Sequence, residues 1–173
     1  MAAPPPASLR LFLALWPPAP VGAALRSHAD AWTWPPNARR TRPERLHITL
    51  HFIGEVPSAE VLPLQAALHV PWPGCDLVLD RAGVWPGGIA VLEGTQVPDA
   101  LQALHAALGE NLRACGAAVE TRRYRPHVTF ARKAQGARPP GEFAPLRWQA
   151  APEYLLMQSL PGGRGYVPLQ RFG

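Results

Sequence analysis

The sequence predicts an α+β fold of two similar lobes, and two observations support this class. A tetrapeptide of one pattern occurs twice, as HITL at residues 47–50 and as HVTF at residues 127–130. The expected elements run strand, helix, strand, helix, two strands, then helix, two strands and a closing hairpin. That order favours paired antiparallel lobes over a single parallel sheet.

The expected elements begin near the N-terminus. Large apolar residues predict a buried strand that ends at a pair of prolines. An Ala-rich helix, an irregular basic loop and the first motif strand follow, and a second helix has Ser58 as its expected N-cap. The expected ranges are strand 8–15, helix 20–34, loop 35–45, strand 47–53 closed by Gly54, and helix 58–70.

Two more strands, a long helix and further strands are expected in the rest of the chain. Its clearest element is a helix over residues 98–115, where leucines recur at intervals of three and four and Gly116 follows the end. The other expected elements are strands 76–82 and 88–92 around a turn at 85–88, a strand beginning at 117–121, motif strand 127–132, a loop over 133–145, and a hairpin of 154–159 with 166–169.

Length and composition favour one globular domain. With 173 residues, 47% apolar and 17% charged, the chain can bury a core. We expect residues 1–7 to be a disordered tail and residues 8–173 to form a single bilobal domain. The apolar run from Leu9 is short and interrupted by Arg10, and no positive charge precedes it, which argues against a signal peptide.

Two cysteines, Cys75 and Cys115, have neither disulfide nor metal spacing. No apolar stretch reaches the length of a membrane span. We therefore expect a cytoplasmic protein without a membrane partner, and a monomer.

The repeated motif predicts a two-histidine site. On a strand, alternation places His47, Thr49 and His51 on one face, with Ile48, Leu50 and Phe52 in the core. The same rule places His127 and Thr129 on one face. If the lobes are related by a pseudo-twofold axis, two imidazoles and two hydroxyls converge in a cleft.

Such a set suits the chemistry of a phosphodiester. One histidine can act as the base for the attacking oxygen and the other as the acid for the leaving oxygen, because an imidazole titrates near pH 6.5. The threonines and an arginine can hold the non-bridging oxygens. The arginine groups before each motif suit an anionic partner, since the net charge of +5 is almost entirely arginine.

Alternative interpretations apply to several of these residues. The spacing of His47 and His51 would bind zinc on a helix, but on a strand it spans about 13 Å, so we expect no metal. His51 is then a residue of the cleft or its rim, and His28, His69 and His105 are surface or structural. The basic loop 39–45 is either solvated or a substrate funnel. Trp85 is either a core residue or a base-stacking one.

HITLHFIG and PHVTFAR resemble the paired signatures of the two-histidine (2H) phosphoesterases, and specifically the RNA 2',3'-cyclic phosphodiesterase and 2'-5' RNA ligase group. RLFLALWPP near the start and LLMQSLPGGRGYVPL near the end resemble the opening strand and closing hairpin of that family, so the likeness covers nearly the whole chain. The resemblance implies a bilobal α+β fold around a central cleft.

The resemblance also implies an activity and its residues: hydrolysis of RNA 2',3'-cyclic phosphate ends to 2'-phosphates, without a cofactor or metal. His127 would activate water, His47 would protonate the leaving oxygen, and Thr49, Thr129 and Arg132 would bind phosphate. Strict alternation places Arg132 on the face opposite His127, so its reaching the phosphate requires a bulge or the end of the strand there.

Two further functions stay open. One is another enzyme of the same fold, either a 2'-5' RNA ligase or a phosphodiesterase for small cyclic nucleotides. The other is an RNA-end binding protein that keeps the cleft without turnover.

Overall fold

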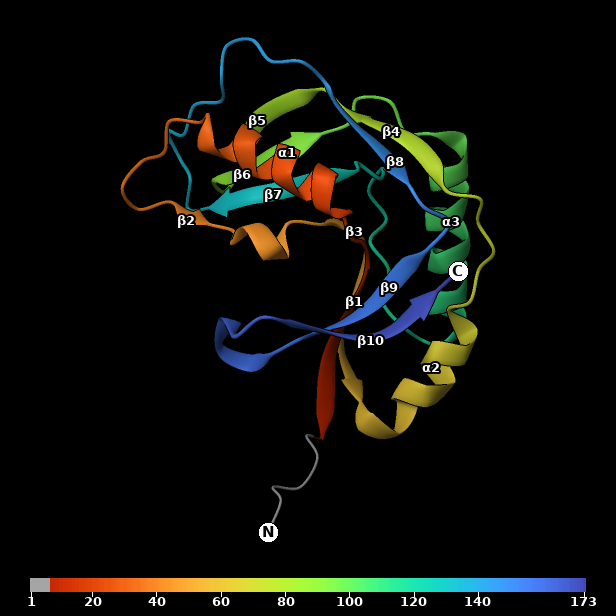
Figure 1. The fold of residues 1–173 in the computed structure, drawn as a ribbon. Helices are drawn as coiled ribbons and strands as arrows, with labels where there is room; N and C mark the ends of the chain where they lie inside the picture. Colours follow the sequence, from red (N-terminus) through yellow and green to blue (C-terminus); the bar gives the residue numbers. More distant parts are fainter. Residues whose placement is uncertain (1–6) are drawn as a thin grey trace.

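The computed structural model describes residues 7–173 of the chain, so most of the expected N-terminal tail lies outside the described residues. The main element is an antiparallel sheet with the strand order β10-β9-β1-β3-β7-β6-β5, in which the short β2 also pairs with β7 (Figure 1). A second sheet contains only β4 and β8. Two motif strands, β3 (Ile48–Pro57) and β7 (His127–Arg132), lie next to each other in the middle of the large sheet.

The chain order of the elements confirms the α+β class. The first part contains β1 (Ser8–Leu15), α1 (Ala19–Asp30), β2 (Arg39–Arg40), β3, α2 (Val61–Ala67), β4 (Cys75–Leu79), β5 (Arg81–Trp85) and β6 (Ile89–Glu93). The second part contains α3 (Asp99–Ala114), β7, β8 (Leu146–Ala150), β9 (Tyr154–Ser159) and β10 (Tyr166–Phe172). Three single-turn 3₁₀ helices, at 43–45, 58–60 and 161–163, complete the described secondary structure.

The two halves of the large sheet meet at one pair of equivalent residues. Ile48 of β3 is directly opposite Val128 of β7, and these residues occupy the same place in the two motifs. An antiparallel pair centred on equivalent residues has a local twofold axis through its centre. The expected pseudo-twofold relation is therefore visible at the seam between β1–β3–β9–β10 and β2–β5–β6–β7.

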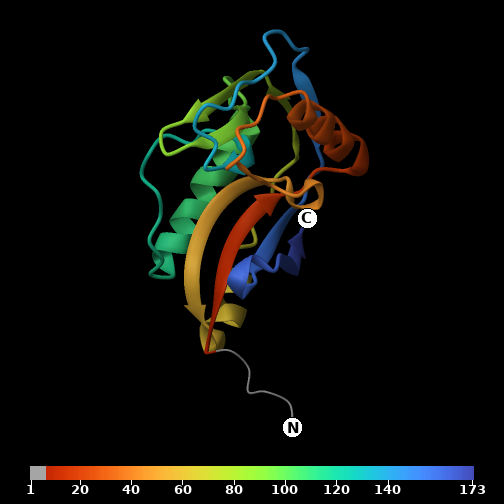
Figure 2. The ribbon, with the colours of Figure 1, turned by 90° about the vertical axis from the view of Figure 1, so that its left-hand side faces the viewer.

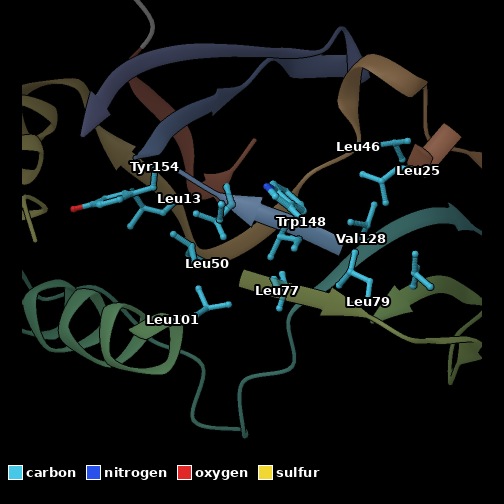
Figure 3. Close-up of a cluster of buried hydrophobic side chains, with 14 of the residues drawn as sticks. Leu13, Leu25, Leu46, Leu50, Leu77, Leu79, Leu101, Val128, Trp148 and Tyr154 are labelled. Carbon is cyan, nitrogen blue, oxygen red and sulfur yellow. The ribbon is translucent and has the colours of Figure 1, made fainter. Parts of the chain in front are cut away.

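One core fills the space behind the large sheet (Figure 3). Side chains from both halves and from the small sheet meet there, including Leu13 of β1, Leu77 of β4 and Val128 of β7. Trp148 of β8 is the largest of the fully buried side chains. Helix α3 contributes its leucine stripe, and α1 covers β7, where Trp32 and His28 pack against Phe130.

Several sequence expectations were wrong in their boundaries. Helix α1 ends at Asp30 instead of residue 34. Ser58 begins a 3₁₀ turn and is not the N-cap of α2, a position held by Glu60. The segment expected as strand 76–82 is two strands in different sheets, because residues before Asp80 pair with β8 and residues after it pair with β6.

Other corrections concern the second half. No strand forms at 117–121, and β8, which pairs with β4, was not expected. The hairpin of β9 and β10 and the helix α3 are confirmed. Along residues 7–173, no helix has the length and apolar character needed to cross a membrane.

Gly54 does not end the first motif strand, which continues to Pro57 beside β1, as the two long curved ribbons in Figure 2 show. Instead, the pairing with β1 shifts by one residue there, and Gly54 has a φ of 86°. Its positive φ is easily adopted only by glycine, so this residue allows the strand to bend without ending.

Candidate active site

Matched β-bulges in the two motif strands determine which side chains reach the site. In β3, Leu50 is an extra residue between the pairs Ala14–Thr49 and Leu13–His51. In β7, Phe130 is an extra residue between the pairs Val91–Thr129 and Ala90–Ala131. The alternation of side chains therefore shifts by one after each bulge.

The bulge in β7 places Arg132 with the motif histidine. Phe130 and Ala131 are both buried, and Arg132 is exposed on the same face as His127 and Thr129. The positive charge of Arg132 is close enough to lower the pKa of His127. This bulge is the irregularity that Arg132 needs in order to share a face with His127.

The equivalent bulge in β3 makes two expectations wrong. His51, expected in the cleft or at its rim, is only 4% exposed and lies on the core side, where its Nε2–H donates to the carbonyl of His105 at 2.8 Å. Phe52, expected in the core, is 66% exposed. Phe52 occupies in β3 the place that Arg132 occupies in β7.

Four polar side chains converge where the two halves meet. In an antiparallel pair centred on Ile48 and Val128, the residues one step away face each other, so His47 lies across from Thr129 and Thr49 lies across from His127. All four side chains are partly buried. The two histidines are close enough that a positive charge on His127 lowers the pKa of His47.

Both histidines are held in the same tautomer by the same local contact. The Nδ1–H of His47 donates to the carbonyl of Arg45, and that of His127 donates to the carbonyl of Arg125, each at 2.7 Å. A carbonyl can only accept, so Nδ1 carries a proton and Nε2 is the nitrogen left for chemistry. The hydroxyl of Thr49 donates to Nε2 of His47 at 3.1 Å.

Aromatic rings surround His47. Trp16 stacks on its imidazole with ring centroids 4.9 Å apart and planes 6° apart. The ring centroids of Phe12 and Tyr166 lie within 5.5 Å of the imidazole centroid. Burial lowers the pKa of His47, the hydrogen bond to the Arg45 carbonyl opposes this, and the charge of His127 lowers it further. These rings come from β1, the loop after it, and β10, and the sequence alone did not reveal them.

A different set of groups surrounds His127. The ring centroids of Trp85 and His127 are 4.4 Å apart. The Arg125 guanidinium lies over the Trp85 ring, 4.2 Å from its centroid. Trp85 is partly exposed and touches the candidate histidine, so it is not a core residue. Arg125 also binds Glu93, with nitrogen–oxygen distances of 2.8 and 3.0 Å.

Glu93 is a buried carboxylate beside the site. It is 3% exposed, is directly opposite His127 in the β6–β7 ladder, and accepts hydrogen bonds from Arg125 and Arg81. Burial would raise the pKa of Glu93, but these arginines outweigh it and hold the pKa below its usual value. Burial also lowers the pKa of His127, opposed by the Arg125 carbonyl and by the charge of Glu93, while Arg125 and Arg132 lower it further.

The remaining histidines lie outside this site. His105 stacks between His51 and Tyr124 on the core side of β3, His28 of α1 packs against Phe130, and His69 is exposed near Phe172. Within the described part of the chain, no group of three or more His, Cys, Asp and Glu side chains has the geometry to hold a metal ion.

Comparison with known proteins agrees with this arrangement. The family model described as the 2'-5' RNA ligase superfamily matches residues 17–155. The chain is 33% identical over 172 residues to the RNA 2',3'-cyclic phosphodiesterase of Escherichia coli strain K12, covering 94% of this chain and 95% of the relative. It is also 30% identical over 145 residues to the protein of that name from Geobacillus stearothermophilus, covering 80% of this chain but 45% of that longer relative.

Solved structures show the same fold. The crystal structure of E. coli LigT complexed with 3'-AMP superposes with a TM-score of 0.79 at 29% identity, covering 95% of this chain and 97% of that one. This chain therefore belongs to the 2'-5' RNA ligase superfamily, the two-histidine phosphoesterases that its paired motifs resemble. Within that superfamily, its relatives of 30% identity or more are cyclic phosphodiesterases by name.

Proposed function

We propose that this protein hydrolyses the 2',3'-cyclic phosphate ends of RNA to 2'-phosphates. The observation that carries the proposal is the meeting of two histidines and two threonines at the seam between the two halves. Each histidine has its proton on Nδ1, which leaves Nε2 for proton transfer. The curated relatives named for this activity support the same reaction.

The proposed reaction is an in-line displacement at phosphorus. Nε2 of His127 removes a proton from water, the water oxygen attacks phosphorus, and the bond from phosphorus to the 3' oxygen breaks. Nε2 of His47 gives its proton to that leaving oxygen, which becomes the 3'-hydroxyl. Histidine serves both roles because its pKa lies near the working pH.

In this proposal, the substrate phosphate is bound by Thr49, Thr129 and Arg132. In the neutral state, the hydroxyl hydrogen of Thr49 is directed to Nε2 of His47. When His47 is protonated, its Nε2–H donates instead, and the Thr49 hydroxyl becomes free to donate to a phosphate oxygen. The guanidinium of Arg132 can meet two oxygens at once and offset the charge that develops there.

The test uses adenosine 2',3'-cyclic phosphate in the presence of EDTA, with the product identified as the 2'- or the 3'-phosphate. We expect the 2'-phosphate from the wild-type protein and a loss of about 10²–10⁴-fold in kcat for His47→Ala and for His127→Ala. His69→Ala is the matched control, because this exposed histidine is outside the site. Full activity in either motif variant would refute the proposal.

Joining of RNA ends through 2'-5' bonds is the second candidate, favoured by the description of the matching family model. A panel of cyclic-ended RNA with and without a 5'-hydroxyl RNA partner separates it from hydrolysis. Tight, salt-sensitive binding of RNA without any product would indicate an RNA-end binding protein instead.

Substrate, location and assembly belong to the same proposal. RNA with a 2',3'-cyclic phosphate end is the expected partner, and small cyclic nucleotides are the alternative. We propose a cytoplasmic monomer, in keeping with two cysteines, Cys75 and Cys115, that form no disulfide.

A further inference from the structure

A second arginine lies beside Arg132 on the face of the site. Arg39 of β2 is directly opposite Arg132 in the β2–β7 ladder, and Arg40 is opposite Ala131. Directly opposite residues place their side chains on the same face of a sheet. Arg39 therefore shares the face of Arg132 and of the candidate histidines, and Arg40 extends from the other face.

The position of β2 agrees with this assignment. β6 pairs along one side of β7, so β3 and β2 share the other side, with β3 at Val128 and β2 at residues 131–132. In Figure 1, β2 lies beside the tip of the β7 arrow. Four residues along a strand separate Arg132 from the level of Ile48, a distance of roughly 10–13 Å.

Within residues 7–173, the charges of Arg39 and Arg132 are not compensated by an acidic side chain, in contrast to that of Arg40. Arg40, on the other face, binds Asp30 at 2.6 Å and lies over the Trp34 ring. Among residues 7–173, neither Arg39 nor Arg132 has an acidic side chain within ion-pair distance, and both are exposed. Two like charges directly opposite each other destabilise a sheet, and a bound anion would remove that cost.

We propose that Arg39 binds the phosphate next to the cyclic one, which in RNA is the phosphate on the 5' oxygen of the terminal nucleotide. This inference rests on the proposed function for the identity of the first phosphate. Arg132, whose charge acts on His127, holds the phosphate that reacts. Arg39, which is absent from the charges that act on either histidine, holds its neighbour. The protein then recognises a polynucleotide end by two adjacent phosphates and discriminates against a free cyclic mononucleotide.

The experiment compares two substrates that differ by one group: adenosine 2',3'-cyclic phosphate with a 5'-hydroxyl and the same compound with a 5'-phosphate. We expect the wild-type protein to have the higher kcat/KM for the 5'-phosphorylated substrate. Arg39→Gln should lose about tenfold or more on that substrate and change less than twofold on the other, because one charge-assisted contact is removed. Arg132→Gln should weaken both.

Two further variants separate charge from fold. Arg39→Lys should keep part of the preference, since it keeps the charge and loses the planar fork. Arg10→Gln is the control. Arg10 is exposed and lies about 16 Å along β1 from Leu15, the residue that pairs with Ile48. It makes the same change in net charge and should leave both substrates unaffected.

A binding measurement keeps this inference separate from the proposed reaction. Calorimetry compares adenosine 2',5'-bisphosphate with adenosine 2'-phosphate, and needs no turnover. Tighter binding of the bisphosphate, lost in Arg39→Gln, supports the inference even if neither cyclic substrate is hydrolysed, which would defeat only the proposed function. An equal effect of Arg39→Gln on both compounds, or no effect, overturns it.

Discussion

The two candidate histidines have matching backbones and different surroundings. Each donates Nδ1–H to the carbonyl two residues before it. His47, however, sits among aromatic rings, while His127 has the buried carboxylate of Glu93 opposite it and two arginines nearby. The charge of Glu93 raises the pKa of His127, and the charges of the arginines lower it. These fixed charges therefore act on His127 more than on His47.

The pH dependence of kcat/KM follows from the directions of these shifts. Burial lowers the pKa of His47 and the pKa of His127 below 6.5 in the free protein. A reaction that needs one protonated and one neutral histidine then has its kcat/KM maximum below pH 6.5. The kcat profile should lie at higher pH, since the bound phosphate anion favours the charged imidazole.

Steady-state kinetics between pH 4.5 and 8.5 provide the measurement. Glu93→Gln removes the charge that raises the pKa of His127, so its profile should move to lower pH. Profiles of kcat and kcat/KM that coincide with a maximum above pH 7 would contradict this account.

At the residue scale, the sequence predicted the site residues that belong to the repeated motif and did not predict those outside it. The repeated motif contains His47, Thr49, His127 and Thr129, and alternation along a strand was enough to place them on one face. Glu93, Trp16 and Tyr166 come from other strands and a loop, where no repeated pattern marks them. Their contact with the histidines depends on strand order and register, which a single sequence does not display.

At the scale of elements, the two bulges decide the composition of the site. Alternation without bulges would have placed His51 in the cleft and Arg132 in the core, and the structure has the reverse. A bulge adds one residue to one strand only, so its presence depends on the partner strand and cannot be counted from one segment. Arg132 offered a clue, because a buried unpaired arginine would be costly.

The shift at Leu50 creates the contact between α3 and β3. His51 and His105 stack with centroids 4.0 Å apart, and His105 stacks on Tyr124 at 3.9 Å. Burial lowers the pKa of His105 to about 4, with His51 and Arg113 adding to this effect, and burial likewise lowers the pKa of His51. The two imidazoles in this contact are therefore uncharged near neutral pH, while the leucines of α3 join the core.

Stability should depend on these histidines in a defined pH window. Their folded pKa values lie below the unfolded value of about 6.5, so the unfolded chain binds more protons and acid favours it. Their contribution is complete above pH 6.5 and is lost as the pH falls toward 4. For His105 it is on the order of 2 kcal/mol, after allowance for its partial exposure.

Urea unfolding between pH 4 and 7.5 measures this window. His105→Phe keeps a ring against Tyr124 but cannot be protonated, so the difference in unfolding free energy from the wild type should change with pH between 6.5 and 4. Subtracting the two proteins removes the common titration of carboxylates. A pH-independent difference would show that these histidines do not control the contact.

At the scale of the whole molecule, a shared core joins the two halves. Leu13 and Leu50 belong to one half, Val128 to the other, and Trp148 of the small sheet lies among them (Figure 3). The α+β class and the two-lobed plan were accessible from element order and the repeated motif. The small β4–β8 sheet was not, because its strands are 71 positions apart at the pair Leu77–Trp148 and carry no common pattern.

We predict that residues 8–173 unfold as one cooperative unit because of this core. Thermal unfolding followed by far-UV circular dichroism and by tryptophan fluorescence should give coincident transitions. Trp148→Phe should lower the unfolding free energy by about 1–3 kcal/mol, because it leaves a cavity at the junction of the sheets. Two separated transitions would show that the lobes are independent domains.

The pairing of Ile48 with Val128 has a consequence for the direction of the proposed chemistry. In the proposed mechanism, a phosphate near that axis would meet an imidazole and a hydroxyl on either side, so the site would offer an acid and a base whichever oxygen leaves. Microscopic reversibility requires the reverse reaction to use the same groups with their roles exchanged. Hydrolysis and end joining then differ in the incoming oxygen, from water or from a ribose, and relative concentrations decide which product accumulates.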